Sequence, residues 1–376
     1  MLFRNFRIIY PDRIETGDLQ VQNGKITRIG NIDTEDQEGV LEGNGRYLSP
    51  GFIDIHIHGA GGKDTMEGTF DALNTISEVL ATHGTTSFLP TTMTMGVEAI
   101  RTAIAAAADA MGRTKGAAII GVHLEGPFIS SNAIGAQNPN YVKSPDIASY
   151  EEMTRGHGDI VRNITLAPEA EGAKELIPYL RERGVNVSIG HTKATYEEAM
   201  EGIRLGCNHS THLFNAMTPM THRAPGVVGA IFDSDITTET ISDGIHIAYP
   251  VLRMAYRQKT SDRVLLVTDA MEACGMPEGT YSLGGQDVIT KDGAARLRSG
   301  ALAGSILTMD QAVRNVLKNT SLPLHEIVKM ASLNGAVFAK VDDRKGRIAE
   351  GYDADLVIFD EEIHVDHVFI EGRQYR

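Results

Sequence analysis

The chain has 376 residues, 42% of them hydrophobic and 22% charged, a composition ordinary for a globular protein with two domains or one large barrel plus an appendage. Its formal net charge of −14 argues against nonspecific binding to nucleic acid or to an anionic membrane. Two cysteines form no disulfide framework and indicate a reducing, cytoplasmic location, and we find neither a signal peptide nor the ~18 consecutive apolar residues of a membrane span.

The first 50 residues are predicted to form short strands and turns, with a hairpin turn at "QNGK". After Pro50, strand-like runs alternate with helical ones. The predicted strands are residues 51–58, 85–91, 117–126, 163–169, 186–192, 207–214, 237–246 and 263–270. Eight strand–helix units in succession predict an α/β fold, a (β/α)8 barrel of the TIM type.

The chain returns to β-structure after the eighth unit. Residues 280–297 are predicted to form a hairpin with "KDG" as its turn, two helical segments follow, and the tail consists of short strands. Because both chain ends are β, they predict one small β-sandwich domain made of residues 1–50 and 345–376. The barrel is then expected to span residues 51–344.

The stretch "GFIDIHIHGAGG", residues 51–62, places two histidines at the end of the first barrel strand. Side chains at i and i+2 of a strand share a face, so His56 and His58 are predicted to lie side by side. Two imidazoles on one face are typical of a metal site. The alternative is a pair of ordinary polar residues at a strand end.

Further ionisable residues favour the metal site, because they also fall at strand ends. The set comprises His56, His58, Glu125, His191, His212, His246 and Asp269. In barrels of this type the active site is built at the C-terminal ends of the strands. Imidazole and carboxylate bind Zn²⁺, Fe²⁺, Co²⁺ or Mn²⁺, and the ligand set does not choose among these metals.

These residue types suit a hydrolase. A bound metal lowers the pKa of water from ~16 toward ~7, and a nearby carboxylate can move the proton from the water to the leaving group. Asp269 in "LLVTDAMEACG" is placed for that role, the alternative being a carboxylate that caps the next turn. His123 and His209 are expected to lie beside the metal ligands without binding metal.

Six longer stretches, in the same order along nearly the whole chain, resemble the N-acetylglucosamine-6-phosphate deacetylases of the amidohydrolase superfamily. They are "HLEGPFIS", "GHTKATYEEA", "THLFNAMTPMTHRAPGVVGAI", "SDGIHI", "VTDAMEACGMPEGTY" and "LAGSILTMDQAVRN". The resemblance implies that Glu125, His191 and His212 bind one metal. Since the first-strand pair His56 and His58 is present, it also implies a second metal with Glu125 as the bridge, hence two divalent metals per subunit.

The resemblance also implies how a phosphorylated amino sugar is bound. Asn215 and the backbone of Ala216 would contact the phosphate, Arg223 would bind it, and His246 would bind substrate. In relatives the last two can reach the neighbouring subunit's site, which implies a homodimer, and whether they serve their own subunit or the neighbouring one stays open at this point. Gln137 occupies a position where some members carry a histidine that polarises the acetyl carbonyl, so the second metal is expected to take over that polarisation.

The activity implied is hydrolysis of N-acetylglucosamine 6-phosphate to glucosamine 6-phosphate and acetate by metal-bound hydroxide, with Asp269 as general base and acid. Two alternatives were weighed. Another amide or amidine hydrolase, such as a cyclic amidohydrolase, is disfavoured by Arg223 and "FNAM". A catalytically inactive scaffold protein is disfavoured because all six expected metal-site residues are intact. Selectivity among N-acetyl amino sugar phosphates stays open.

Overall fold

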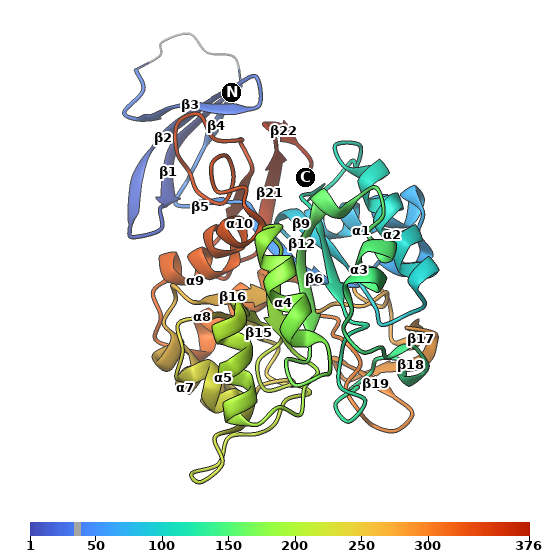
Figure 1. Ribbon diagram of the computed structural model, residues 1–376. Helices are drawn as coiled ribbons and strands as arrows, with labels where there is room; N and C mark the ends of the chain where they lie inside the picture. Colours follow the sequence, from blue (N-terminus) through green and yellow to red (C-terminus); the bar gives the residue numbers. More distant parts are fainter. Residues whose placement is uncertain (34–38) are drawn as a thin grey trace.

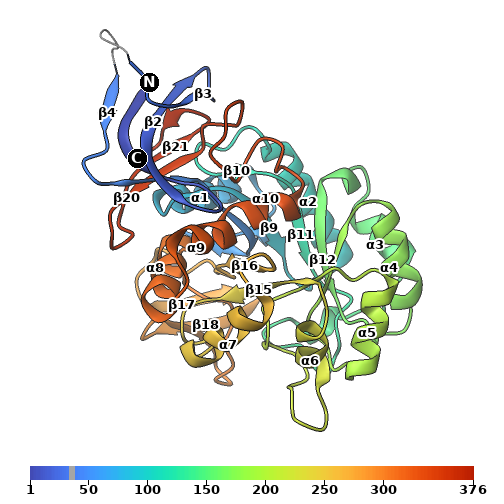
Figure 2. The same cartoon turned by 90° about the vertical axis from the view of Figure 1, so that its left-hand side faces the viewer.

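The structure is a computed structural model that describes residues 1–33 and 39–376. Residues 34–38 of the predicted terminal domain lie outside the described residues. A barrel of parallel strands surrounded by helices forms the larger part, and a sheet made from both chain ends lies beside it (Figures 1 and 2). Within the described ranges, no helix is long and apolar enough to cross a membrane.

The barrel strands coincide with all eight predicted segments, which confirms the predicted barrel. They are β6 (Phe52–Ile57), β9 (Thr85–Thr92), β10 (Ala118–Ile119), β11 (Val122–Glu125), β12 (Val161–Leu166), β13 (Asn186–Ile189), β14 (His209–Ser210), β15 (Thr237–Ile241) and β16 (Val264–Val267). The third predicted strand is divided into β10 and β11. Neighbouring strands pair in parallel from β6 through β9 to β16.

Backbone hydrogen bonds close the barrel between its first and last strands. The Asp269 N–H donates to the His56 carbonyl at 2.9 Å, and the His58 N–H donates to the Ala270 carbonyl at 2.8 Å. The closure therefore lies at the C-terminal ends of β6 and β16, and it brings Asp269 next to the two histidines of the first strand.

The helices bury one apolar face each against the barrel. They are α1 (Phe70–Thr82), α2 (Val97–Ala110), α3 (Ile147–Met153), α4 (Ala173–Glu182), α5 (Tyr196–Leu205), α6 (Gly226–Phe232), α7 (Tyr249–Lys259), α8 (Met309–Asn319), α9 (Leu324–Ala331) and α10 (Leu333–Ala339). In α1, for example, Leu73, Ile76 and Leu80 recur at helical spacing and are buried. The capping box formed by Thr195 and Glu198 starts α5.

The sheet of the chain ends confirms that both termini pair with each other. Its strands are β1 (Leu2–Ile9), β2 (Ile14–Gln22), β3 (Lys25–Gly30), β4 (Val40–Glu42), β5 (Tyr47–Pro50), β20 (Leu356–Phe359), β21 (Val365–Ile370) and β22 (Arg373–Gln374). β5 pairs with β1 on one side and with β20 on the other. The rings of Phe3 and Phe369 lie 5.0 Å apart although β1 and β21 are not neighbours in the sheet, so the sheet curls around a core of its own.

A ribbon of three strands follows the barrel, one strand more than the hairpin predicted for residues 280–297. β17 (Gly279–Leu283), β18 (Gln286–Lys291) and β19 (Ala294–Leu297) pair in antiparallel order. The predicted turn at "KDG" joins β18 to β19, and the extra turn is at Gly284 and Gly285, which both have positive φ. The ribbon lies at the lower right in Figure 1.

Candidate metal centre

Six of the predicted site residues gather at one end of the barrel. His56 and Glu125 lie at the ends of β6 and β11, and the other four follow β6, β13, β14 and β16 within two residues. The carboxyl ends of neighbouring parallel strands lie at the same end of the barrel. Residues that are far apart in the sequence but that each follow a strand therefore lie close together in space. The six side chains are His56, His58, Glu125, His191, His212 and Asp269, none more than 7% exposed.

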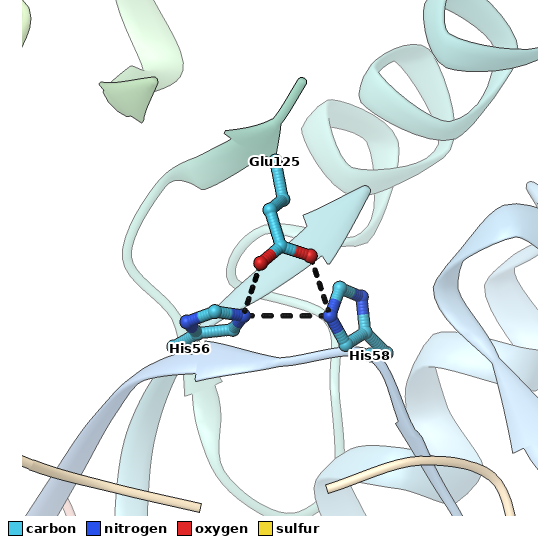
Figure 3. Close-up of side chains that lie close together, drawn as sticks. All are labelled: His56, His58 and Glu125. Carbon is cyan, nitrogen blue, oxygen red and sulfur yellow. Dashed lines mark hydrogen bonds and ion pairs between the residues drawn. The ribbon is translucent and has the colours of Figure 1, made fainter. Parts of the chain in front are cut away.

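The Glu125 carboxylate lies at the centre of this cluster. Its Oε1 is 3.5 Å from His56 Nε2, and its Oε2 is 3.1 Å from His58 Nε2, while the two Nε2 atoms are 3.4 Å apart (Figure 3). The two histidines of the first strand therefore point at the same carboxylate, each toward a different oxygen. These three side chains can converge on one cation.

A second pair of histidines approaches Glu125 from the other side of the barrel rim. His191 Nε2 and His212 Nε2 lie 3.1 and 3.0 Å from Glu125 Oε1, and 3.1 Å from each other. Together with Glu125 they form a second group of three potential ligands. Glu125 is therefore the member that both groups of potential ligands share.

The hydrogen bonds on the far side of the rings show that this donor set suits a metal. His58 Nδ1 lies 3.2 Å from the Thr91 carbonyl, and His191 Nδ1 lies 3.0 Å from the Ala133 carbonyl. A carbonyl only accepts hydrogen bonds, so each Nδ1 carries the proton and each Nε2 can offer its lone pair to a metal. The residues present therefore fit divalent metal ions.

The electrostatics of the cluster follow from packing carboxylates and imidazoles together in a buried site. Burial raises the pKa of Glu125, but His56, His191 and His212 outweigh it and hold that pKa well below its ordinary value. Burial likewise opposes ionisation of Asp269, whose pKa His56 and His58 nevertheless lower. The cluster thus keeps both carboxylates ionised, which is the form that binds cations and accepts protons.

The backbone at several of these positions is strained. His191, His212 and Asp269 have φ of 47°, 27° and 48°, and Ala216 has 51°. Side-chain-bearing residues rarely adopt positive φ, and each costs on the order of 1–3 kcal/mol. Such outliers gather where the surrounding structure imposes them, and here all four residues line one pocket.

Five of the six side chains, all but His56, line a pocket of about 610 Å³. The pocket is also lined by four more predicted residues, Gln137, Asn215, Ala216 and His246. Asp243 accepts a hydrogen bond from His246 Nδ1 at 2.7 Å and from the His246 N–H at 2.8 Å, so the orientation of that ring is fixed.

Gln137 and Arg223 differ in where the structure places them. The Gln137 amide donates a hydrogen bond to Glu125 Oε2, and Gln137 Oε1 accepts one from the Thr94 N–H at 2.7 Å. Gln137 therefore helps to fix the position of the Glu125 carboxylate. Arg223 is not among the described residues that line the pocket. It lies beside His222 in the exposed loop 219–225, which projects from the barrel before α6 (Figures 1 and 2).

The sequence reasoning also missed several residues at the site. Lys193 and Arg296 line the pocket, the latter from the β17–β19 ribbon. Glu239 lies behind His56 and is fully buried. Its position on the seventh barrel strand, facing the interior, was the one available signal, but Glu within "TTETI" is equally typical of a solvent-facing strand.

A barrel whose strand ends carry this histidine–carboxylate cluster defines a metal-dependent hydrolase of the TIM-barrel class. Residues 47–375 match the Amidohydrolase family, and the chain belongs to that family.

Individual proteins give a narrower comparison. The chain is 42% identical to an N-acetylglucosamine-6-phosphate deacetylase of Lysinibacillus sphaericus, covering 99% of this chain and 97% of that protein. It is 34% identical to an N-acetylgalactosamine-6-phosphate deacetylase of Escherichia coli O157:H7, covering 96% and 95%. A crystal structure of N-acetylglucosamine-6-phosphate deacetylase from Pasteurella multocida superimposes with a TM-score of 0.94 at 32% identity, covering 99% and 98%.

Proposed function

We propose that this chain hydrolyses the acetamide of N-acetylglucosamine 6-phosphate, giving glucosamine 6-phosphate and acetate, as an enzyme of amino sugar metabolism. The observation that carries the proposal is Glu125, shared between two pairs of histidines next to Asp269 on the floor of a pocket. The family and the names of its most similar relatives supply the reaction and the substrate.

Two divalent metals are proposed to be held by this chain. His56, His58 and Glu125 would hold one of them, and Glu125, His191 and His212 would hold the other. Bound there, the metals lower the pKa of a water molecule and polarise the acetyl carbonyl. The convergence of four Nε2 atoms on the two oxygens of one carboxylate supports this assignment.

Asp269 is proposed as the proton carrier. Its Oδ1 lies 3.4 Å from His56 Nε2 and 3.4 Å from His58 Nε2, at the edge of the cluster. From there it can accept a proton from the attacking water and donate it to the amide nitrogen as the C–N bond breaks. Water thereby supplies the second oxygen of acetate and the proton that the amide nitrogen gains when the C–N bond breaks.

The remaining pocket residues are proposed to bind the sugar phosphate. Asn215, the Ala216 backbone and His246 line one part of the pocket and contribute polar groups to it. Gln137 uses one amide hydrogen on Glu125, so a second amide hydrogen is left to donate to the acetyl carbonyl. We propose that it helps to orient that group.

The proposed activity is tested by measuring acetate release from three compounds with metal-loaded protein. We expect rapid release from N-acetylglucosamine 6-phosphate and slow release from unphosphorylated N-acetylglucosamine. The C4 epimer, N-acetylgalactosamine 6-phosphate, is the third compound, since one relative carries that name. Equal rates with and without phosphate would refute the proposed substrate class, and faster release from the epimer would reassign the sugar.

Arg223 is proposed to bind the substrate phosphate of the neighbouring subunit in a homodimer. Support comes from the exposed loop that carries Arg223 and from exposed apolar side chains. Met220 lies on the same loop, Ile245 lies before α7, and Val251 and Met254 lie on α7. Exposed apolar side chains on neighbouring segments are typical of a surface that a partner covers. His246, which lines the pocket of its own subunit, is proposed to meet the phosphate bound in that pocket.

Arg223→Ala is expected to raise KM for the phosphorylated sugar roughly 10- to 100-fold, because a hydrogen bond to a charged group contributes about 1.5–3 kcal/mol. The already slow reaction of the unphosphorylated sugar should change little. Steady-state kinetics on both substrates measure the difference. Equal losses on both would remove the phosphate role.

Mixing subunits tests whether Arg223 acts across the interface. In a heterodimer of Arg223→Ala and His191→Ala chains, one site carries both defects and the other carries neither. If Arg223 serves the neighbour, mixing restores activity above either parent. No recovery, with subunit exchange confirmed by mass spectrometry, would assign Arg223 to its own subunit.

A cytoplasmic location is also proposed. Cys207 and Cys274 are both buried and unpaired in the described structure, as expected for a protein kept in a reducing compartment.

A further inference from the structure

Behind His56, on the side away from the pocket, lies a fully buried carboxylate that the proposed reaction does not use. Glu239 is on β15, at the centre of the barrel, and is 0% exposed. A buried carboxylate is costly unless its oxygens receive hydrogen bonds. Its contacts therefore indicate what it is there to do.

One oxygen of Glu239 holds two of the candidate metal ligands. Its Oε2 lies 2.8 Å from His56 Nδ1 and 3.0 Å from the His212 N–H. The first contact is to a side chain on β6, and the second is to the backbone after β14. His56 belongs to one group of three ligands and His212 to the other. Glu239 Oε2 therefore contacts one ligand of each proposed metal site, on the side of that ligand that faces away from the metals.

The contact with His56 sets which ring nitrogen faces the metals. With the Nδ1 proton donated to Glu239, His56 Nε2 is free to offer its lone pair toward Glu125. His58 and His191 have carbonyl partners for the same purpose, so His56 differs in having a charged one. A carboxylate partner increases the basicity of the imidazole and strengthens its bond to a cation.

The contact with His212 supports a strained turn. His212 has φ of 27°, and the next N–H, that of Leu213, donates to the Glu239 backbone carbonyl at 3.0 Å. Among the described residues, His212 Nδ1 has no hydrogen-bond partner. The position of this ring therefore depends on the backbone, and Glu239 holds that backbone through both its side chain and its main chain.

We propose that Glu239 is a positioning residue that holds His56 and His212 in place for metal binding and so couples the two metal sites. This inference rests on the proposed metal centre. The other oxygen of Glu239 lies 3.3 Å from His209 Nε2, and His209 Nδ1 lies 2.6 Å from Thr237 Oγ1, which completes the support on the far side.

An alternative role would be a third metal site, since His56, His123 and Glu239 also lie close together. That role would require His56 to bind cations through both ring nitrogens. His123 Nε2 is 2.7 Å from Thr165 Oγ1, and its Nδ1 is 3.5 Å from Thr91 Oγ1. Both ring nitrogens of His123 therefore have hydrogen-bond partners in the barrel interior without a metal there.

The experiment measures metal affinity and uses three variants. Glu239→Gln keeps an acceptor but loses the charge, and Glu239→Ala loses both. Thr238→Val is the matched control, because Thr238 is a buried neighbour on the same strand that bonds Ser210 Oγ at 2.5 Å instead. Affinity for Co²⁺ is measured by competition with a chelator, and the Co²⁺ absorption spectrum reports the ligand geometry.

We expect affinity to fall roughly 10-fold in Glu239→Gln and roughly 100-fold in Glu239→Ala, the range found for partners of metal ligands, with an altered Co²⁺ spectrum. Thr238→Val should match the wild type. If Glu239→Ala does not fold, Glu239→Asp is measured instead. This variant keeps the charge but shortens the side chain by one methylene, and we expect its Co²⁺ affinity to fall about 10-fold.

Wild-type affinity and spectrum in the Glu239 variants, with only a lower Tm, would mean a merely structural role and overturn the inference. Wild-type protein that takes up more than two Co²⁺ per chain, with the extra ion lost in Glu239→Gln, would overturn it in favour of a third site. Metal-loaded wild type that binds Co²⁺ but releases no acetate would refute the proposed activity and leave this inference standing.

Discussion

Asp269→Asn is expected to lower kcat for acetate release roughly 100- to 10,000-fold, the usual contribution of a positioned general acid–base group. Asn keeps the shape of the side chain but cannot carry the proton from water to the amine. Since His56, His58, His191, His212 and Glu125 remain, the protein should still bind metal. Metal content by elemental analysis and steady-state kinetics, measured on the same preparation, separate these two effects.

Asp310→Asn is a matched control for this variant. Asp310 is another buried carboxylate paired with a histidine, His83, at 3.2 Å, and it is not among the residues that line the pocket. Its substitution should leave kcat within a few-fold of the wild type. An Asp269→Asn enzyme that retained more than about a tenth of the wild-type rate would assign the proton transfer to another group.

Replacing His191 or His212 with alanine is expected to remove tightly bound metal and with it nearly all activity. Each ring offers Nε2 to the same point near Glu125 Oε1, so either substitution leaves one histidine and one carboxylate there. Metal ions contribute several kcal/mol to such a reaction, which corresponds to a loss of roughly 1,000-fold or more. Elemental analysis and acetate release measure the two consequences.

His364→Ala provides the comparison for a histidine outside the site. His364 is exposed on the turn before β21 and pairs with Asp360. It should keep full metal content and full rate. If His191→Ala or His212→Ala behaved like His364→Ala, the proposed ligand assignment would be wrong.

The barrel was predictable because its evidence is local. Most strands are short runs rich in apolar and β-branched residues, and they alternate with helical segments eight times along the chain. The histidine pair at the first strand end was equally readable, because period-two alternation places His56 and His58 on one face whatever lies around them. Once the barrel is predicted, its closure between the first and last strands places these histidines next to Asp269.

The supporting residues were not predictable in the same way. Glu239 is flanked by threonines on a strand, and only the polar interior of the closed barrel turns it toward His56. Gln137 was expected to face substrate, whereas in the structure its side chain forms hydrogen bonds with Glu125 and with the backbone of Thr94. Both outcomes depend on contacts between segments far apart in the chain, which periodicity and spacing do not contain.

The pairing of β5 with β20 has a consequence for how the chain folds during its synthesis. β5 lies in the middle of the sheet of the chain ends, yet Leu48 finds its partner Ile358 roughly 300 residues later, after roughly 15–60 s of translation. During that time β5 presents an unpaired edge to the cell, the kind of edge that recruits chaperones or other nascent chains. β20, which is synthesised late, therefore protects β5, which is synthesised early.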